Sequence, residues 1–124
     1  MRNFKLLASL CVFLGFTSYT KSQNFISLNN ESFNKTLGQT ENAQLIDVRT
    51  AEEVANGAIK NSINISIASP NFEAQIKKLD NTKPIFVYCQ GGGRSKKVAE
   101  IFHKLGFKTI YELDKGYGNW KNTN

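Results

Sequence analysis

Residues 84–106 combine an apolar run, a glycine-rich turn and an amphipathic helix pattern in direct succession. The run PIFVY, from Pro84 to Tyr88, has the composition and length of a buried central strand. The turn CQGGGRS follows at once, and behind it apolar residues recur at helical spacing: Val98, Ile101, Phe102 and Leu105. Three successive glycines are costly to order and add nothing to a core. They therefore indicate that the backbone here approaches another group closely. We predict a strand, a tight loop and a helix that Ser95 caps and Gly106 ends.

The remaining sequence alternates between short apolar runs and helical patterns. Further strands are expected at 25–28, 44–48, 63–67 and 109–113. Further helices are expected at 30–38, 50–57 and 69–79, with a helical turn at 117–121. The helix at 50–57 opens on the capping box TAEE. Strands that alternate with crossover helices predict an α/β fold, in which a single domain has a central parallel sheet with helices on both faces.

The first 22 residues differ in character from the rest of the chain. Two basic residues precede an apolar or small-residue run from Leu6 to Phe16, and a short polar segment follows it. This pattern is typical of a secretory signal peptide, and the run is too short to span a bilayer comfortably. We therefore expect a signal peptide over 1–22, cleaved after Ser22, and a mature domain over 23–124. That domain would be exported to the periplasm or the cell exterior and not embedded in the membrane; the alternative is an uncleaved membrane anchor.

The charge of the chain gives no indication of a nucleic-acid partner. The chain has 16 basic and 10 acidic side chains and a formal net charge of +6. Loss of residues 1–22 removes Arg2, Lys5 and Lys21 and leaves 13 basic and 10 acidic residues, a net charge of +3. This charge is too small to indicate nucleic-acid binding, and aromatic residues are not interleaved with the basic ones as a stacking surface requires. We expect no nucleic-acid partner.

The two cysteines restrict the chemistry further. Cys11 lies inside the apolar run, which disfavours a lipoprotein, and it would leave with the signal peptide. The mature domain would then hold Cys89 alone and could form no internal disulfide. With His103 as the only histidine it could form no structural zinc site either, so we expect no metal and no cofactor. Cys89 is then an inert buried thiol, an intermolecular partner or a reactive nucleophile.

The predicted fold places Cys89 at the carboxyl end of a central strand, the edge where open α/β sheets bind ligands. The turn leads into a helix N-terminus, which directs N–H groups and the positive end of the helix dipole inward. Together with Arg94, these groups predict a stabilised thiolate whose pKa lies below the free value of about 8.5, with an anion held at the sulfur. The simpler alternative, a tight turn with a structural cysteine, explains one glycine but not three glycines and an arginine.

Three separated motifs resemble the rhodanese, or sulfurtransferase, domain. The active loop of that family, C-x-x-G-x-R-S, is matched by Cys89, Gly92, Arg94 and Ser95. The segment LIDVRTAEEVANGAIKNSINI, residues 45–65, is similar to an earlier signature of the family, and LDKGYGNW is similar to its closing Leu-Asp-Gly-Gly-x-x-x-Trp. The resemblance covers Phe25 to Lys121.

The sequence departs from the family pattern at two positions. Ala58 stands where the family usually has histidine, and Lys115 stands where it often has glycine. Neither position lies on the active loop, so we interpret both as changes to local packing or surface.

The resemblance implies a sulfurtransferase that moves a sulfane sulfur from a small anionic donor such as thiosulfate to a thiophilic acceptor, cyanide or a thiol. Cys89 would be the nucleophile and would carry the sulfur as a persulfide. The loop N–H groups would bind that anion; the loop residues are Gln90, Gly91, Gly92, Gly93, Arg94 and Ser95. Arg94 would help to hold the loop and attract the donor. Asp47 and Arg49 would either bind substrate or, as we favour, form an ion pair that supports the loop.

Two other classes of function stay open at this point. A cysteine phosphatase or arsenate reductase also combines a cysteine, N–H groups and an arginine. Those loops resemble C-x5-R, whereas Cys89 to Arg94 is C-x4-R and one residue shorter. A rhodanese-like domain can also be a non-catalytic binding module, although such modules often lack the cysteine that this chain retains. Lys96 and Lys97 are expected on the exposed face of their helix, where, close to Arg94, they would also raise the local potential for anions. His103 is expected on the polar side of the same helix.

Overall fold

The computed structural model describes residues 24–120, so the expected signal peptide and its cleavage site lie outside the described residues. All strand pairs in the sheet are parallel, and the strand order is β1-β5-β4-β2-β3. The strands are β1 (Ile26–Leu28), β2 (Gln44–Asp47), β3 (Ile63–Asn64), β4 (Ile85–Tyr88) and β5 (Ile110–Leu113). The helices are α2 (Asn30–Gln39), α3 (Ala51–Ala55), α4 (Phe72–Ile76), α5 (Gly93–Lys104) and the 3-10 turn η1 (Tyr117–Asn119). The predicted α/β fold with a parallel sheet is confirmed.

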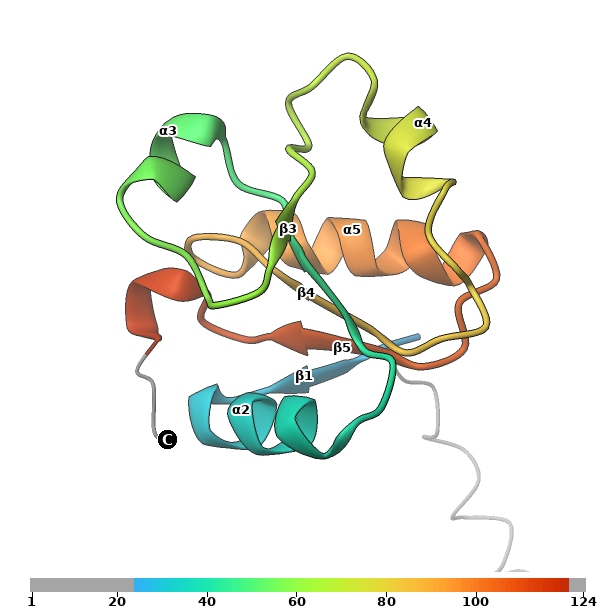
Figure 1. Ribbon diagram of the computed structural model, residues 1–124, viewed down its shortest axis with the longest axis horizontal. Helices are drawn as coiled ribbons and strands as arrows, with labels where there is room; N and C mark the ends of the chain where they lie inside the picture. Colours follow the sequence, from blue (N-terminus) through green and yellow to red (C-terminus); the bar gives the residue numbers. More distant parts are fainter. Residues whose placement is uncertain (1–23, 121–124) are drawn as a thin grey trace, which may run out of the picture.

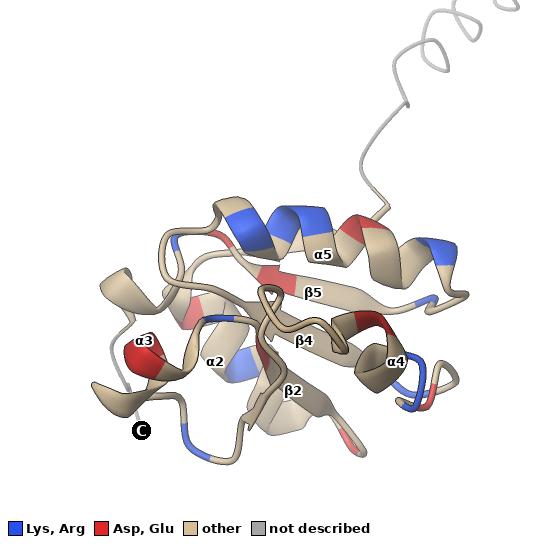
Figure 2. Ribbon diagram, turned by 90° about the horizontal axis from the view of Figure 1, so that it is seen from above, with Lys and Arg blue, Asp and Glu red and all other residues tan. Residues whose placement is uncertain are grey.

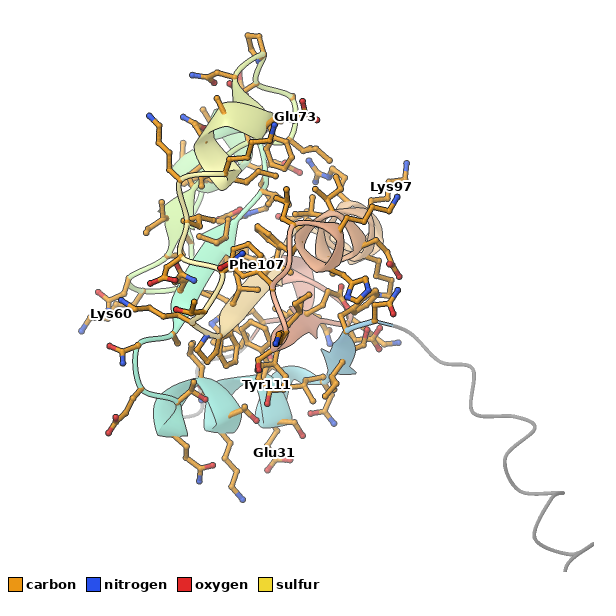
Figure 3. All side chains as sticks on the ribbon, turned by 90° about the vertical axis from the view of Figure 1, so that its right-hand side faces the viewer. Glu31, Lys60, Glu73, Lys97, Phe107 and Tyr111 are labelled. Carbon is orange, nitrogen blue, oxygen red and sulfur yellow. The ribbon has the colours of Figure 1, made fainter. Side chains whose placement is uncertain are left out.

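Helices cover both faces of the sheet, as predicted (Figure 1). On one face, Phe33 of α2 packs in a cluster with buried residues of β2, β4 and β5. On the other face, α4 and α5 close a larger cluster, to which α5 contributes Val98 and Phe102. Figure 3 shows the same division, because Lys97 extends outward from α5 whereas Phe107 lies in the interior.

Strand β4 sets the position of Cys89, because side chains alternate between the two faces of a strand. Ile85 and Val87 belong to the cluster beneath α5, whereas Phe86 and Tyr88 belong to the cluster beneath α2. Cys89 follows the strand directly and continues the alternation on the α5 side. The thiol is therefore directed toward the helix that begins four residues later.

Some predicted boundaries are wrong by a few residues. α2 is capped by Asn29, whose side chain accepts the N–H of Ser32 at 2.8 Å, and Gly38 lies inside this helix instead of ending it. The helix expected from residue 69 begins at Phe72, and β3 pairs over two residues instead of 63–67. The expected capping box of Thr50 and Glu53 is present, with both of its hydrogen bonds.

The start of α5 also differs from the prediction. Gly92 occupies the N-cap position with φ 101°, a left-handed conformation that favours glycine. Gly93 is therefore the first residue of the helix and Ser95 the third. The prediction that Ser95 caps this helix is wrong, because the glycine turns the chain into the helix earlier than a serine cap would. Ser95 consequently lies inside the first turn, with its N–H available to the loop.

Ile46 and Ile63 offer a matched test of the assigned faces, because they are neighbours across the β2–β3 ladder. Ile46 is fully buried, whereas Ile63 is 53% exposed. We expect Ile46→Ala to lower the free energy of unfolding by about 2–5 kcal/mol, because it leaves a cavity in a packed core. Ile63→Ala should cost less than about 1 kcal/mol. Urea unfolding followed by circular dichroism measures both, and equal losses would contradict these assignments.

Candidate active site

Cys89 lies at the centre of the site, buried at the carboxyl end of β4. The backbone N–H groups of Gly92 and Ser95 donate to its Sγ at 3.0 and 3.3 Å. The same sulfur contacts Ser95 Oγ at 3.4 Å. Gly92 and Ser95, both among the loop residues predicted to surround the sulfur, therefore direct their N–H groups at Cys89 itself.

The surroundings of Cys89 change the pKa of its thiol in two opposing ways. Burial raises the pKa, because it disfavours the charged thiolate. Hydrogen bonding with Ser95 and with the N–H groups of Gly92 and Gly91 lowers it. The hydrogen bonds outweigh burial, and the net direction is down from the ordinary value. The expectation of a stabilised thiolate is consistent with this geometry.

The three glycines of the loop have different surroundings. Gly92 combines its positive φ with a close approach, since a Cβ built there would lie 2.1 Å from the carbonyl oxygen of Asp114. A Cβ at Gly91 or Gly93 would meet nothing within 4 Å. The fold therefore requires glycine at 92, whereas residues 91 and 93 are exposed and have room for a side chain.

Arg94 points away from the sulfur and toward α3. Its Nη1 and Nη2 atoms bind Oε1 and Oε2 of Glu53 at 2.9 and 2.8 Å, a bidentate ion pair. Glu53 also accepts the backbone N–H of Thr50 as part of the capping box. Arg94 thus ties the active loop to α3, and its charge is compensated by Glu53. The prediction that Arg94 holds the loop agrees with this contact.

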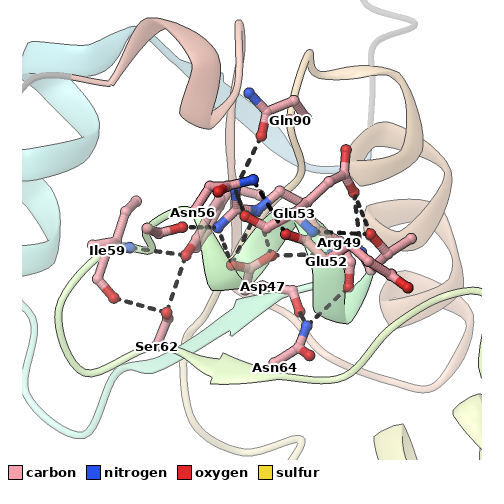
Figure 4. Close-up of polar contacts among 12 residues, drawn as sticks. Asp47, Arg49, Glu52, Glu53, Asn56, Ile59, Ser62, Asn64 and Gln90 are labelled. Atoms are coloured by element: carbon pink, nitrogen blue, oxygen red, sulfur yellow. Dashed lines mark hydrogen bonds and ion pairs between the residues drawn. The ribbon is translucent and has the colours of Figure 1, made fainter.

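Asp47 and Arg49 form the expected ion pair, buried beside the loop (Figure 4). Arg49 Nη2 lies 2.7 Å from Asp47 Oδ2, and Arg49 Nε donates to both carboxylate oxygens. Arg49 Nη1 donates to Gln90 Oε1 at 2.9 Å, and its guanidinium lies 4.3 Å from the ring centre of Tyr117. The pair therefore fixes the first residue after Cys89, which is the supporting role we favoured.

The start of the loop is also fixed by the backbone of η1. Tyr117 N–H donates to the carbonyl of Cys89 at 2.8 Å, and Gly118 N–H donates to the carbonyl of Gln90 at 3.0 Å. A shallow hollow of about 370 Å³ lies beside this junction. Its lining residues are Arg49, Glu53, Asn56, Gln90 and Tyr117. This hollow offers a small molecule a polar approach to the loop.

The sequence alone did not identify Glu112 as a neighbour of Cys89. Glu112 of β5 is fully buried and accepts the hydroxyl of Ser95 at 2.5 Å. Lys96 Nζ binds Glu112, Asp114 and the carbonyl of Gly92, although its side chain is 37% exposed. Lys96 is therefore partly exposed and also paired with acidic groups of the site. Lys97 and His103 are exposed, as expected. The one available signal was an acidic residue inside an otherwise apolar strand, at 112.

Within residues 24–120, no group of three or more histidine, cysteine, aspartate or glutamate side chains is arranged to hold a metal ion.

Known proteins share this fold and resemble this chain in sequence. The rhodanese-like domain family matches residues 29–123. The chain is 34% identical over 77 residues to thiosulfate sulfurtransferase GlpE of Coxiella burnetii, which covers 62% of this chain and 70% of that protein. It is 32% identical over 108 residues to a tRNA uridine(34) hydroxylase of Pelagibacter ubique, covering 86% of this chain but 35% of the hydroxylase. A solved rhodanese-like domain protein of Staphylococcus aureus superposes with a TM-score of 0.68 at 25% identity, covering 81% of this chain and 95% of that one.

The contrast between Gly92 and Gly91 can be tested directly. Gly92→Ala should lower the free energy of unfolding by about 1–3 kcal/mol or more, because the new Cβ meets the Asp114 carbonyl in a strained conformation. Gly91→Ala, with open space around its Cβ, should change stability by less than about 0.5 kcal/mol. Thermal and urea unfolding measure both variants. Similar losses at the two positions would show that the loop conformation does not depend on Gly92.

The Glu53–Arg94 pair predicts a pH dependence of stability. Hydrogen bonds from Arg94 and from Thr50 lower the pKa of Glu53 from 4.5 to about 2. A carboxylate with a lowered pKa stabilises the fold fully above its ordinary pKa, and this contribution is lost as the pH falls toward 2. We therefore expect the stability difference between the wild type and Glu53→Gln to be constant near pH 7 and to shrink between about pH 4.5 and 2. A difference that does not change over this range would contradict the ion pair.

Proposed function

Because this chain belongs to the rhodanese-like domain family, we propose that it is a sulfurtransferase in which Cys89 accepts a sulfane sulfur and passes it on as a persulfide. The observation that carries the proposal is the sulfur of Cys89, held by the N–H groups of Gly92 and Ser95 at the start of α5. The similarity to thiosulfate sulfurtransferases supports the same class of reaction.

In the first half of the proposed reaction, the Cys89 thiolate attacks the outer sulfur of a donor such as thiosulfate. A bond forms between Sγ and that sulfur, and the bond between the two donor sulfurs breaks. Sulfite leaves with the electron pair, so no oxidant or reductant is consumed. Because the thiolate is stabilised by hydrogen bonds in the resting site, no general base is needed for this step.

The loop also has donors for the added sulfur. Gly93 and Arg94 are the first two residues of α5, whose N–H groups have no acceptor within the helix. Neither N–H makes a hydrogen bond to another residue in the part of the chain that the structure describes. A persulfide anion on Cys89 would find these groups, together with the positive end of the helix dipole, on the same side as the thiolate.

In the second half, a thiophilic acceptor attacks the outer sulfur of the persulfide. The bond between the two sulfurs breaks, and Cys89 leaves as the thiolate from which it started. The N–H groups of Gly92 and Ser95 stabilise this leaving group, because they already donate to Sγ. The acceptor would be cyanide or a thiol.

The geometry favours this reaction over the alternatives. In a phosphatase the loop arginine must bind the phosphoryl oxygens, but both terminal nitrogens of Arg94 are bound to Glu53. The loop is also one residue shorter than C-x5-R. A non-catalytic module has no need of a thiol with a lowered pKa, which Cys89 has.

Export remains part of the proposal. It rests on the charged start, short apolar run and polar segment of residues 1–22. In residues 24–120, no helix has the length and apolar character needed to cross a membrane. N-terminal sequencing of the mature protein would locate the cleavage, expected after Ser22.

The sulfur-loading step can be tested on the purified protein. Incubation with thiosulfate should increase the mass by one sulfur atom, and cyanide should remove that mass and release thiocyanate. Cys89→Ser should gain no sulfur while keeping the fold, because the substitution is nearly isosteric. Arg94→Ala should still react with iodoacetamide, since the N–H groups of Gly92 and Ser95 remain.

Intact-mass spectrometry and a thiocyanate assay measure these outcomes, with a phosphatase assay run in parallel. If the wild type gains no sulfur from any sulfane donor and Cys89 reacts as an ordinary thiol, the enzymatic proposal is wrong.

A further inference from the structure

Glu112 is a buried carboxylate that the proposed reaction does not use. It lies on β5 beneath the basic first turns of α5, where the acidic segment of the strand is visible in Figure 2. Its side chain has no solvent exposure. Ser27 Oγ donates to Oε1 at 2.6 Å, whereas Ser95 Oγ and Lys96 Nζ bind Oε2 at 2.5 and 3.2 Å. A buried charge is costly, so its position one hydroxyl away from the nucleophile needs an explanation.

The hydroxyl of Ser95 connects this carboxylate to Cys89. Ser95 Oγ lies 3.4 Å from Cys89 Sγ on one side and 2.5 Å from Glu112 Oε2 on the other. A hydroxyl has one proton to donate, and a carboxylate paired with a lysine can only accept. The carbonyl of Gly92, at 3.2 Å, is a longer and uncharged alternative acceptor. The proton of Ser95 is therefore directed at Glu112, and the oxygen lone pairs face the sulfur.

We propose that Glu112 is a positioning residue for the nucleophile: it holds the single proton of the Ser95 hydroxyl and so leaves the Cys89 sulfur with backbone N–H donors alone. The inference rests on the proposed function, because it concerns how the nucleophile of that reaction is adjusted. Lys96 supports the arrangement, since its ammonium group pairs with Glu112 and also binds the carbonyl of Gly92.

The arrangement has a chemical consequence. The backbone N–H groups of Ser95, Gly92 and Gly91 lower the pKa of the thiol. The Ser95 hydroxyl, 3.4 Å from Sγ, would lower this pKa as well if it donated to the sulfur instead of to Glu112. A thiolate with too low a pKa attacks sulfur more slowly, because nucleophilicity falls with pKa with a Brønsted slope of about 0.4–0.5. The backbone N–H groups thus favour the ionised form of Cys89, and Glu112, by withholding the Ser95 proton, preserves the nucleophilicity of that thiolate.

Other charged groups lie near Glu112 and near Cys89, the two residues that the Ser95 hydroxyl connects. Lys96 of α5 and Asp114 after β5 lie beside Glu112. Around the loop that holds Cys89, Arg94 is paired with Glu53 of α3 and Arg49 with Asp47 of β2. None of these side chains is substituted in the variants below. Glu112→Gln does remove one partner of Lys96, and the Ser95→Ala background described below separates this change of charge from the effect of the hydroxyl.

The test is the pH profile of iodoacetamide alkylation of Cys89 in full-length protein. In Glu112→Gln, a neutral amide competes weakly for the Ser95 proton, and the hydroxyl is free to turn toward the thiolate. The midpoint should move to lower pH by about one unit, the size of one added hydrogen bond to a charged group. The limiting rate at high pH should fall about threefold, following the Brønsted slope. An unchanged or higher midpoint would overturn the proposal.

Two further variants separate this effect from a general loss of charge. Ser27→Ala removes a comparable hydroxyl from the other oxygen of Glu112, and it should leave the midpoint in place. In a Ser95→Ala background there is no hydroxyl to release, so Glu112→Gln should lose most of its shift. If the shift is equally large with and without the Ser95 hydroxyl, the carboxylate acts through its charge alone and the proposal is wrong.

The proposal can still be tested if the Glu112→Gln variant does not fold. The direction in which Ser95→Ala shifts the alkylation midpoint then tests the proposal. Removal of an oxygen that only accepts moves the midpoint to lower pH, whereas removal of a hydroxyl that donates to the sulfur moves it to higher pH. A higher or unchanged midpoint in Ser95→Ala would overturn the proposal. Alkylation does not depend on any sulfur donor, so failure of sulfur loading and failure of this inference are observed separately.

Discussion

The buried guanidinium of Arg49 determines how the edge of the sheet is organised around Cys89. A charge with almost no solvent exposure must be compensated by its surroundings. Asp47 supplies the opposite charge, and the remaining donors bind the carbonyl of Gly57 and the side chain of Gln90. Segments that follow β2, α3 and β4 therefore converge on one group. Loss of one partner would leave a buried donor of Arg49 unsatisfied, so these contacts hold the active loop against its neighbours.

The ion pairs around the loop determine which groups can stabilise negative charge at Cys89. Both arginines near the loop are neutralised, Arg49 by Asp47 and Arg94 by Glu53. Lys96, which follows Arg94 by two residues, is bound to Glu112 and Asp114. Stabilisation of negative charge at Cys89 then falls to the N–H groups of the loop and the first turn of α5. Such dipoles are fixed by the backbone, so they need no reorganisation when the charge on the sulfur changes.

The sequence was sufficient for the parts of this structure that depend on local patterns. Alternating strand and helix signals predicted the parallel sheet, and the position of Cys89 after a buried strand placed it at the ligand-binding edge. The network around Glu112 was not predictable, because a charged residue in a short strand gives no indication of which helix will cover it. The role of Ser95 was misjudged for a related reason: whether a glycine adopts a positive φ depends on what surrounds it, here the Asp114 carbonyl beside Gly92.

The three successive glycines can now be separated by physical cause. Gly92 is required by the fold, because both its conformation and the approach of the Asp114 carbonyl exclude a side chain. Gly91 and Gly93 are not, since each is exposed and a Cβ would meet open space. Glycine at 93 even weakens the first turn of α5, where most residues form helix more readily. Bare backbone at these two positions leaves their N–H groups unshielded by side chains, which is the property that binding of an anion at Cys89 requires.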